Sequence, residues 1–409
     1  MSYIKQAVEG FSWQTILKIL SSLVALAKIS VLARLLSPDD FGLFSLTAIA
    51  LGLSEAAAQT GINITILQSK KTIAYFLNTA WVIAIARGFI IATAMTLIGI
   101  GLSHYFDNPR LITLVALTSL VPVIKGFINP SIIMMHKNMK FFQDSLYYFT
   151  LVIVEGILAI SLGFLLHSVE AMILSMIGAA MFEVVISFLF FKHRPQFRYL
   201  TSRAQTIFHN AKWLSLSSLM GYLNDNLDDL IIGKLFGTYQ LGLYHNAYAL
   251  THKTNYDLAR SVHHGTLPIY TKIALNPSSL KKAIFQTFGW TSLLLLITSL
   301  VVITFPESII KIVLGDQWLD AVPLVKWLTM AGVAHSLALL GYTLFLAKSA
   351  YKTLNFHQLT NLVLTVSLIV FLGLKQGLLG AVIGLALGRI LSLPIIAYGV
   401  YQQTKPTNN

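Results

Sequence analysis

The sequence predicts an all-α integral membrane protein with about twelve transmembrane helices. Of its 409 residues, 56% are hydrophobic and only 11% are charged, whereas a soluble chain carries roughly 25% charged residues. The apolar residues fall into runs close to the length of about 20 that a membrane-spanning helix needs. Short basic loops separate these runs. Together, the three observations exclude a soluble globular protein.

The remaining composition narrows the partners and the chemistry. The chain has no cysteine, which excludes disulfides, thiolate metal sites and a cysteine nucleophile. Its net charge of +13 is scattered over short loops, so we expect membrane lipids as partners and no nucleic acid. The first apolar run, from Phe11 to Leu36, lacks a small-residue cleavage site, and we interpret it as a retained first span.

Twelve apolar helical runs form two sets of six. In the first half we expect helices at residues 11–33, 41–60, 74–102, 111–135, 146–166 and 170–191. In the second half we expect them at residues 211–234, 240–265, 285–305, 321–346, 355–374 and 377–401. The fourth is less regular because it contains Pro122 and Pro130, and the eighth is unusually polar. The predicted domains are residues 1–200 and 201–409, divided in the longest basic loop.

The loop charges predict the topology. With the N-terminus inside, most loop lysines and arginines fall in cytoplasmic segments, and the opposite loops are richer in acids. The positive-inside rule therefore places both termini in the cytoplasm.

The two halves resemble each other at an offset of 200 residues. Arg34–Phe44 and Lys234–Tyr244 both begin with a basic residue and a leucine and end in Gly-Leu-aromatic. Because six spans preserve orientation, we expect parallel repeats, with a substrate path between them that opens by alternating access. Chance similarity of two short turns is the alternative.

Polar stripes run along the first and seventh helices. The first stripe consists of Gln14, Lys18, Ser21, Ala25 and Lys28, and the second of Leu214, Ser218, Gly221, Asp225 and Asp228. Charges at membrane depth are costly and usually face a wet cavity or each other, so we expect these residues to bind substrate or to act as coupling groups. Alternatively, Lys18 and Lys28 snorkel to an interface, or Asp228 pairs with Lys28 in a structural contact.

The eighth span is the most polar. Its first face combines His252, Tyr256, Arg260 and His263, and its second face combines Asn246, Lys253, Asp257 and His264. A helix this polar cannot face lipid all round, so we expect it to line an aqueous cavity. Arg260 with the histidines suits a phosphate or another anion. Lys253 and Asp257 could also form only a local salt bridge.

Other charges within the spans have different expected roles. Arg87, inside the third span, is a further cavity candidate. We expect Glu155 and Glu183 to pair with a neighbouring helix and Arg389 to snorkel. There is no phosphate-binding loop, catalytic motif or sufficient metal-ligand set, so the chain is predicted not to be an enzyme and to need no cofactor or metal.

Several segments resemble a known family. They are Trp13, Leu32–Leu43, Gln59–Ile62, Gly221–Asp229, Gly242–Tyr248 and Leu314–Pro323. In order and spacing they resemble the polysaccharide-exporting flippases, the Wzx class of the multidrug/oligosaccharidyl-lipid/polysaccharide (MOP) exporter superfamily, and especially the colanic-acid exporter group. The resemblance runs over essentially the whole chain. Relatives in this class often continue to fourteen helices, which leaves the role of their extra pair open here.

The resemblance implies a MATE-like fold of two six-helix lobes around a central cavity. It also implies flipping of undecaprenyl-pyrophosphate-linked oligosaccharide across the bacterial inner membrane, for export of O-antigen, other lipopolysaccharide or exopolysaccharide. By the same resemblance, Lys28, Arg87 and Arg260 are candidates to hold the pyrophosphate, and Asp225 and Asp228 are polar partners or coupling groups. The coupling ion is left open between H+ and Na+, and polysaccharide polymerase or assembly proteins are candidate partners.

Three other functions remain as alternatives. A cation-coupled multidrug antiporter of the MATE type would need a carboxylate-dominated, aromatic-lined pocket. A membrane glycan polymerase or ligase would need a large external loop, and the predicted loops are short. The chain could also act only as an assembly subunit of a polysaccharide complex.

Overall fold

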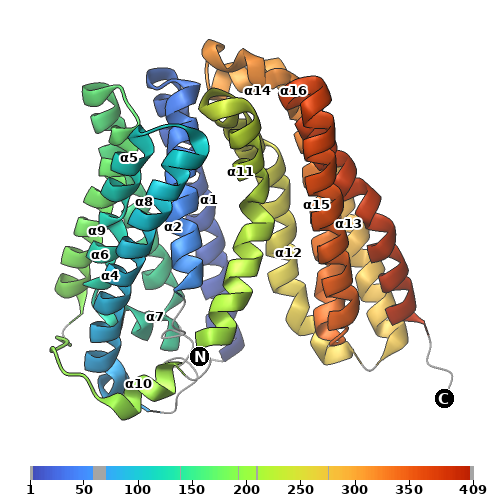
Figure 1. The fold of residues 1–409 in the computed structure, drawn as a ribbon. Helices are drawn as coiled ribbons and strands as arrows, with labels where there is room; N and C mark the ends of the chain where they lie inside the picture. Colours follow the sequence, from blue (N-terminus) through green and yellow to red (C-terminus); the bar gives the residue numbers. More distant parts are fainter. Residues whose placement is uncertain are drawn as a thin grey trace. The chain divides into compact units, whose positions relative to one another are not determined.

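Helices form every regular element of the described structure. This computed structural model describes residues 3–58, 71–138, 140–191, 193–208, 211–274 and 276–405, and no strand occurs in those ranges. The chain divides into two compact units, Met1–Leu227 and Asp228–Asn409. Each unit is described by itself below, with the helix labels of Figure 1.

The first unit follows the predicted spans of the first half. Its elements are α1 (Tyr3–Leu35), α2 (Pro38–Ala57), α4 (Ile73–Phe106), α5 (Arg110–Thr118), α6 (Leu120–Gly126), η1 (Pro130–Ile132), α7 (Ile133–Lys137), α8 (Phe141–Leu166), α9 (Glu170–Phe190), α10 (Thr201–Phe208) and the start of α11 (Ala211–Leu250). The predicted fourth span, 111–135, is divided over α5, α6, η1 and α7. Pro130 begins the 3-10 turn η1, as expected for a residue that cannot donate a backbone hydrogen bond.

The second unit continues from the rest of α11. Its other elements are α12 (His252–Ile273), α13 (Pro277–Thr304), α14 (Pro306–Val313), η2 (Asp316–Ala321), α15 (Val322–Ala347) and α16 (Tyr351–Thr404). Two long helices are each interrupted by one glycine with positive φ: Gly237 in α11 and Gly377 in α16. These breaks separate the predicted seventh from the eighth span and the eleventh from the twelfth.

The predicted membrane fold is confirmed. Eight helices among the described residues are long and apolar enough to cross a membrane, judged by length and composition. The last of these is α16, which Gly377 divides into two segments. The other predicted spans correspond to the interrupted stretch from α5 to α7 and to the polar segments of α11 and α12.

A few predictions fall outside the described residues. The end of the predicted span 41–60 and the Gln59–Ile62 motif are among them, and so are the side chains of Trp13, Gln14, Leu214 and Lys253.

The two predicted repeat turns occur at the same register. Ser37 caps α2: its hydroxyl accepts from the Asp40 backbone N–H at 3.2 Å, and the Asp40 carboxylate accepts from the Ser37 N–H at 3.1 Å. At the position 200 residues later, Gly237 breaks α11 with φ 85°. A residue with a Cβ would be strained in that conformation. The turns therefore coincide in position, while their backbone geometry differs.

Polar contacts join helix ends in the first unit. Arg110, which begins α5, donates two hydrogen bonds to the Glu170 carboxylate of α9, at 2.8 and 3.0 Å. Beside them, the Asp40 carboxylate accepts from the Val169 backbone N–H at 3.2 Å. Both bonds to Glu170 come from Arg110 Nη2. Charge-assisted hydrogen bonds are stronger than neutral ones, so these contacts hold α2, α5 and α9 together at one end.

Small residues bring the two segments of α16 together. Gly380, Gly384 and Gly388 recur every four residues, and a Cβ added at Gly384 would lie 2.3 Å from the Leu368 carbonyl oxygen. Such small-residue spacing lets helix backbones approach closely in membranes. This close approach places residue 389, the next along the chain, inside the unit.

Candidate functional site

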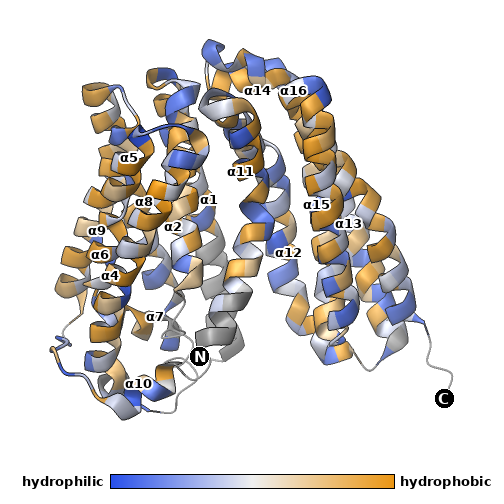
Figure 2. Cartoon of the chain, viewed as in Figure 1, coloured by the Kyte–Doolittle hydropathy of each residue, from blue (hydrophilic) through white to orange (hydrophobic). Residues whose placement is uncertain are grey.

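The α12 helix carries a polar face. Figure 2 shows hydrophilic residues along much of α12, whereas α13, α15 and α16 are largely hydrophobic. The α12 polar face is defined by four exposed residues at helical spacing: Asp257, Arg260, Ser261 and His264. The opposite side of α12 is buried through His252, Asn255 and Ala259. The helix therefore separates an exposed polar surface from a buried one.

Two carboxylates on α11 are held by the segment that follows the Gly237 break. The Tyr244 hydroxyl donates to Asp228 Oδ2 at 2.5 Å, and His245 Nδ1 lies 3.2 Å from Asp229 Oδ1. The two residues of each pair are 16 positions apart in the sequence. They meet because the break at Gly237 folds α11 back on itself. Asp228 and Asp229 are thereby fixed in place within the second unit.

Arg389 brings a buried positive charge to these carboxylates. Its side chain is 6% exposed, and its Nη2 lies 3.9 Å from Asp228 Oδ2. Its Nη1 contacts His252 Nε2, and its guanidinium carbon lies 5.9 Å from the centre of the Tyr248 ring. The expectation that Arg389 snorkels to an interface is therefore wrong. A nearby carboxylate, an imidazole and an aromatic face offset the cost of burying its charge.

His252 contacts a second imidazole as well as Arg389. His335 Nδ1 of α15 also lies 3.4 Å from His252 Nε2.

Aromatic rings extend the network along α12. Tyr248 and His252 stack with centroids 4.2 Å apart, and Tyr256 stacks on His335 at the same distance. Gly332 allows α15 to come this close, because an added Cβ would lie 2.8 Å from the His252 Cα. We call the set Asp228, Tyr244, Tyr248, His252, Tyr256, His335 and Arg389 the buried network.

Two atoms of the buried network lack hydrogen-bond partners among the described residues. They are Asp228 Oδ1 and His252 Nδ1. Buried polar atoms are usually paired, so these two are exceptions within the network.

The structure brings three predicted site residues of the second unit together. Asp228, His252 and Tyr256 belong to the buried network. His263 lies further along α12, where its Nδ1 is 2.7 Å from the Thr343 hydroxyl of α15. Arg260 is exposed and lies with Asp257 on the α12 polar face. The four residues that were predicted to share one face of α12 are therefore divided between its buried side and its exposed side.

The predicted site residues of the first unit are placed separately. Lys28 donates to the Glu155 carboxylate of α8 at 2.7 Å, which confirms the expectation that Glu155 pairs with a neighbouring helix. Arg87 is half-buried, and its Nη2 lies 3.4 Å from the Glu55 carbonyl oxygen. Lys18 and Asp225 are exposed, on α1 and α11. A substrate role for these residues stays a prediction.

Sequence reasoning missed four members of the buried network: Tyr244, Tyr248, His335 and Arg389. A usable signal was present in the sequence, because Arg389 directly follows the repeated glycines at 380, 384 and 388. A charge placed next to a close helix contact is more easily buried than one on a lipid-facing surface.

Comparisons with known proteins point to polysaccharide biosynthesis. A family model described as polysaccharide biosynthesis protein matches residues 31–323. The chain is similar to lipopolysaccharide biosynthesis protein WzxC of Escherichia coli (strain K12), with 21% identity over 413 residues, covering 98% of this chain and 82% of that protein. It is also similar to teichuronic acid biosynthesis protein TuaB of Bacillus subtilis (strain 168), with 20% identity over 379 residues, covering 92% and 78%.

Solved structures share the fold. The lipid II flippase MurJ in an inward closed conformation matches with TM-score 0.69 and 15% identity, covering 95% of this chain and 87% of that one. An inward-facing multidrug resistance MATE family transporter of the MOP superfamily matches with TM-score 0.66 and 15% identity, covering 95% and 96%. At this identity the likeness establishes the fold alone, and it confirms the predicted MATE-like fold.

Proposed function

The chain belongs to the polysaccharide biosynthesis protein family, and from this premise we propose that it flips a lipid-linked oligosaccharide across a membrane. The cargo in this proposal is an undecaprenyl-pyrophosphate-linked oligosaccharide. It moves from the inner to the outer leaflet of the bacterial cytoplasmic membrane by alternating access. The similarity to WzxC and TuaB, whose names refer to lipopolysaccharide and teichuronic acid biosynthesis, supports a glycan cargo.

The observation that carries the proposal is the exposed α12 polar face. A glycan head group cannot cross hydrocarbon without polar partners, because each unsatisfied polar group there costs several kcal/mol. Ionisable residues in membrane-spanning segments normally face a functional pathway. The exposed hydroxyl, imidazole, carboxylate and guanidinium of the α12 polar face provide both donors and acceptors. Such a mixture suits sugar hydroxyls better than it suits an apolar drug.

Arg260 is the proposed phosphate contact on that face. A guanidinium presents a planar set of donors that matches phosphate oxygens. Arg389, in contrast, already contacts Asp228 and His252 inside the unit. We therefore assign the pyrophosphate to the exposed arginine and a supporting role to the buried one.

The buried network is the proposed mechanical support of the α12 polar face. It ties α12 to α11, α15 and α16 through polar and ring contacts, so the face would move with those helices as a unit. Hydrogen-bond networks in a low-dielectric interior hold their members rigidly when most of them are satisfied. Alternating access by rocking of one half of a transporter requires that the substrate-binding face moves as a rigid body.

Coupling and location belong to the same proposal. Asp225 and Asp228 are the candidate coupling groups, and the driving ion is H+ or Na+. Both termini face the cytoplasm, and a polysaccharide polymerase or assembly protein would receive the flipped cargo. No covalent bond is made or broken in this activity, so the proposed protein is a transporter and not an enzyme.

The test is a deletion strain complemented with Arg260 variants. Losing one charge-assisted contact of about 1.5–3 kcal/mol should reduce export about 10- to 100-fold in Arg260→Ala, with the lipid-linked glycan accumulating in the cytoplasmic leaflet. Arg260→Lys keeps the charge and should retain part of the activity. Lys272→Ala, at an exposed position near the end of the same helix, is the control and should export normally.

Two outcomes would contradict the proposal. Normal export by Arg260→Ala would show that Arg260 does not hold the phosphate. Altered drug susceptibility in the deletion strain, with glycan export intact, would show that the protein acts as a multidrug antiporter and not as a flippase.

A further inference from the structure

Three basic residues from separate segments of the first unit meet around Tyr75, where α4 begins. Lys71 Nζ lies 5.8 Å from the centre of the Tyr75 ring, and the guanidinium carbon of Arg203, in α10, lies 4.1 Å from the same ring. Arg203 also donates a hydrogen bond to the Tyr75 carbonyl oxygen. Lys137, the last residue of α7, donates to the Lys71 carbonyl oxygen at 2.8 Å. We call Lys71, Tyr75, Lys137 and Arg203 the basic cluster.

The basic cluster concentrates positive charge. Its three cations come from stretches that contain no aspartate or glutamate: residues 56–106, 108–143 and 184–224. Asp144, the next acidic residue after Lys137, is only 5% exposed. Arg194 and Arg198, on the segment before α10, are exposed and add to the charge. Basic side chains gathered on one surface raise the local concentration of anions, so this surface attracts a negatively charged group.

The segment that leads into α10 is fastened to α4. The Gln196 backbone N–H donates to the Asn78 side-chain oxygen at 2.9 Å, and the Leu200 N–H donates to the Thr79 hydroxyl at 3.3 Å. A site whose parts are fixed before binding loses less conformational entropy when the ligand binds. These contacts therefore present Arg203 to a ligand in a defined position.

The basic cluster lies where the membrane-type surface of the first unit begins. The candidate span of α4 begins at Tyr75, and that of α9 ends at Phe190. On the segment between α9 and α10, Phe197 is 72% exposed and packs on Trp81 of α4 with ring centroids 4.6 Å apart. Aromatic side chains are enriched at the level of the lipid head groups. The ends of the two spans and these aromatic residues therefore place the cluster at the membrane–water interface.

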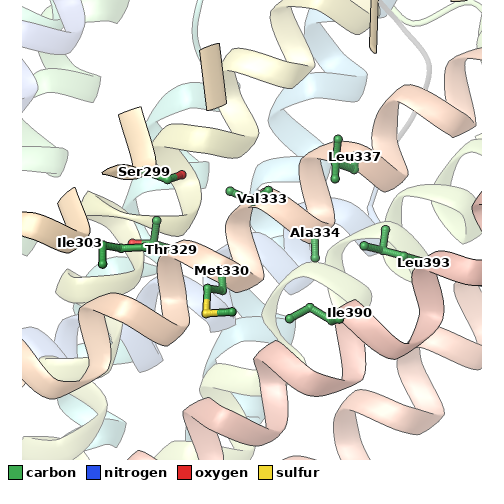
Figure 3. Close-up of a pocket in the computed structure, with 9 residues that line it drawn as sticks. All are labelled: Ser299, Ile303, Thr329, Met330, Val333, Ala334, Leu337, Ile390 and Leu393. Carbon is green, nitrogen blue, oxygen red and sulfur yellow. The ribbon is translucent and has the colours of Figure 1, made fainter. Parts of the chain in front are cut away.

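An apolar groove in the second unit is a surface of a different kind. Its volume is about 200 Å³. Figure 3 shows its lining, which comes from α13, α15 and α16: Ser299, Ile303, Thr329, Met330, Val333, Ala334, Leu337, Ile390 and Leu393. None of these lining residues is charged, so nothing in the groove distinguishes an anionic lipid from a neutral one. Selection of a lipid by its charge is a property of the basic cluster.

We propose that the basic cluster binds the phosphate of an anionic phospholipid, such as phosphatidylglycerol. A guanidinium has five N–H donors, so Arg203 can hold the Tyr75 carbonyl oxygen and a phosphate at the same time. The Lys71 ammonium adds a second positive charge, and the acyl chains lie along the apolar surface of α4 and α9. In the predicted topology this lipid belongs to the cytoplasmic leaflet. The inference goes beyond the proposed function, because it needs no lipid-linked glycan and no transport.

The experiment measures lipid binding to the full chain by native mass spectrometry in a neutral detergent. Phosphatidylglycerol and phosphatidylcholine with the same acyl chains are titrated in separate samples. Phosphatidylglycerol should bind at least fivefold more tightly, because only its head group has a net negative charge. Hydrogen exchange should slow in residues 71–81 and 193–203 when phosphatidylglycerol is present, which locates the site.

Substitution of two cluster cations provides the matched comparison. Lys71→Gln/Arg203→Gln should weaken phosphatidylglycerol binding about 10- to 30-fold, since each basic residue near an anionic lipid surface contributes roughly fivefold. Lys281→Gln/Lys282→Gln removes the same charge at exposed positions of α13 and should change binding less than twofold. Lys71→Gln alone retains the contact between Arg203 and Tyr75, so it covers the case in which the double variant fails to fold. It should weaken binding several-fold.

Four results would overturn the phospholipid site. Equal affinity for the two lipids would show that head-group charge is not recognised. Equal losses in the two double variants would show that lipid responds to the net charge of the chain and not to the basic cluster. Displacement of phosphatidylglycerol by millimolar inorganic phosphate would identify a free anion as the ligand. Undecaprenyl phosphate that binds more than tenfold more tightly than phosphatidylglycerol would identify a polyprenyl phosphate as the ligand.

Discussion

Arg389 and Asp228 face each other inside the second unit, with Nη2 and Oδ2 3.9 Å apart and only 6% of each side chain exposed. The two residues come from opposite ends of that unit, α11 and α16. A buried pair of this kind contributes little net stability, because desolvation of both charges offsets their attraction. It does fix which faces of the two helices meet, because it joins α11 to α16.

Removing one partner of this pair should be costly. Arg389→Met leaves the Asp228 carboxylate buried without its counter-charge, and we expect a loss of about 3–5 kcal/mol in the free energy of unfolding. The double variant Asp228→Asn/Arg389→Met should recover much of that loss, since neither charge remains. Unfolding in detergent, followed by tryptophan fluorescence, measures both. Lys326→Met, at an exposed position of α15, is the control. Equal losses in the single and double variants would contradict the pairing.

The ion pair between Lys28 and Glu155 can be tested by charge reversal. Lys28→Glu and Glu155→Lys should each lower the yield of folded protein, because each places like charges 2.7 Å apart in the present geometry. The double reversal should restore folding. If Lys28 also holds the substrate, as predicted, the double variant will fold without exporting glycan. Recovery of both folding and export would show that the pair is only structural.

The glycine contact inside α16 predicts a position-specific effect of a single methyl group. Gly384→Ala would bring a Cβ to 2.3 Å from a backbone oxygen, and we expect a loss of about 1–3 kcal/mol of stability from overpacking. Gly101→Ala, in α4, meets nothing within 4 Å and should be neutral or slightly stabilising, because alanine favours helix. Thermal unfolding of both variants tests the contact, and similar behaviour of the two would contradict it.

The absence of cysteine makes the topology directly measurable. Single cysteines at Ser349 and Asp107 would be the only thiols in the chain. The predicted topology places residue 349 in the cytoplasm and residue 107 outside. A membrane-impermeant maleimide added to intact cells should label the cysteine at 107, and it should label the one at 349 only after lysis. The reverse labelling pattern would show that the protein has the opposite orientation in the membrane.

The sequence predicted most of the fold because hydropathy is a local property. The spans, the polar eighth helix and the register of the Gly237 turn all follow from composition, periodicity or the internal repeat. The prolines at 122 and 130 indicated that the fourth span is irregular. The structure interrupts it at Ser119, shortly before Pro122, and begins η1 at Pro130. Such features need no knowledge of which helices touch.

The site could be predicted only in part, because it depends on contacts between distant segments. The polarity of α12 identified His252, Tyr256 and Arg260, but spacing alone assigned them to one face. The structure buries His252 and exposes Arg260, because α15 packs closely against one side of α12 at Gly332. The burial of Arg389 likewise follows from the glycine contact within α16 and from the position of Asp228, which no local pattern reveals.

The central claim is that this chain moves a lipid-linked oligosaccharide between leaflets. The most direct measurement is a proteoliposome assay in which purified protein is reconstituted with an undecaprenyl-pyrophosphate-linked oligosaccharide, and externally added glycosidase reports the fraction of glycan facing out. The account predicts that the digestible fraction rises with wild-type protein and stays near the protein-free level with Arg260→Ala. A digestible fraction that is the same with wild-type protein as in protein-free vesicles would contradict it.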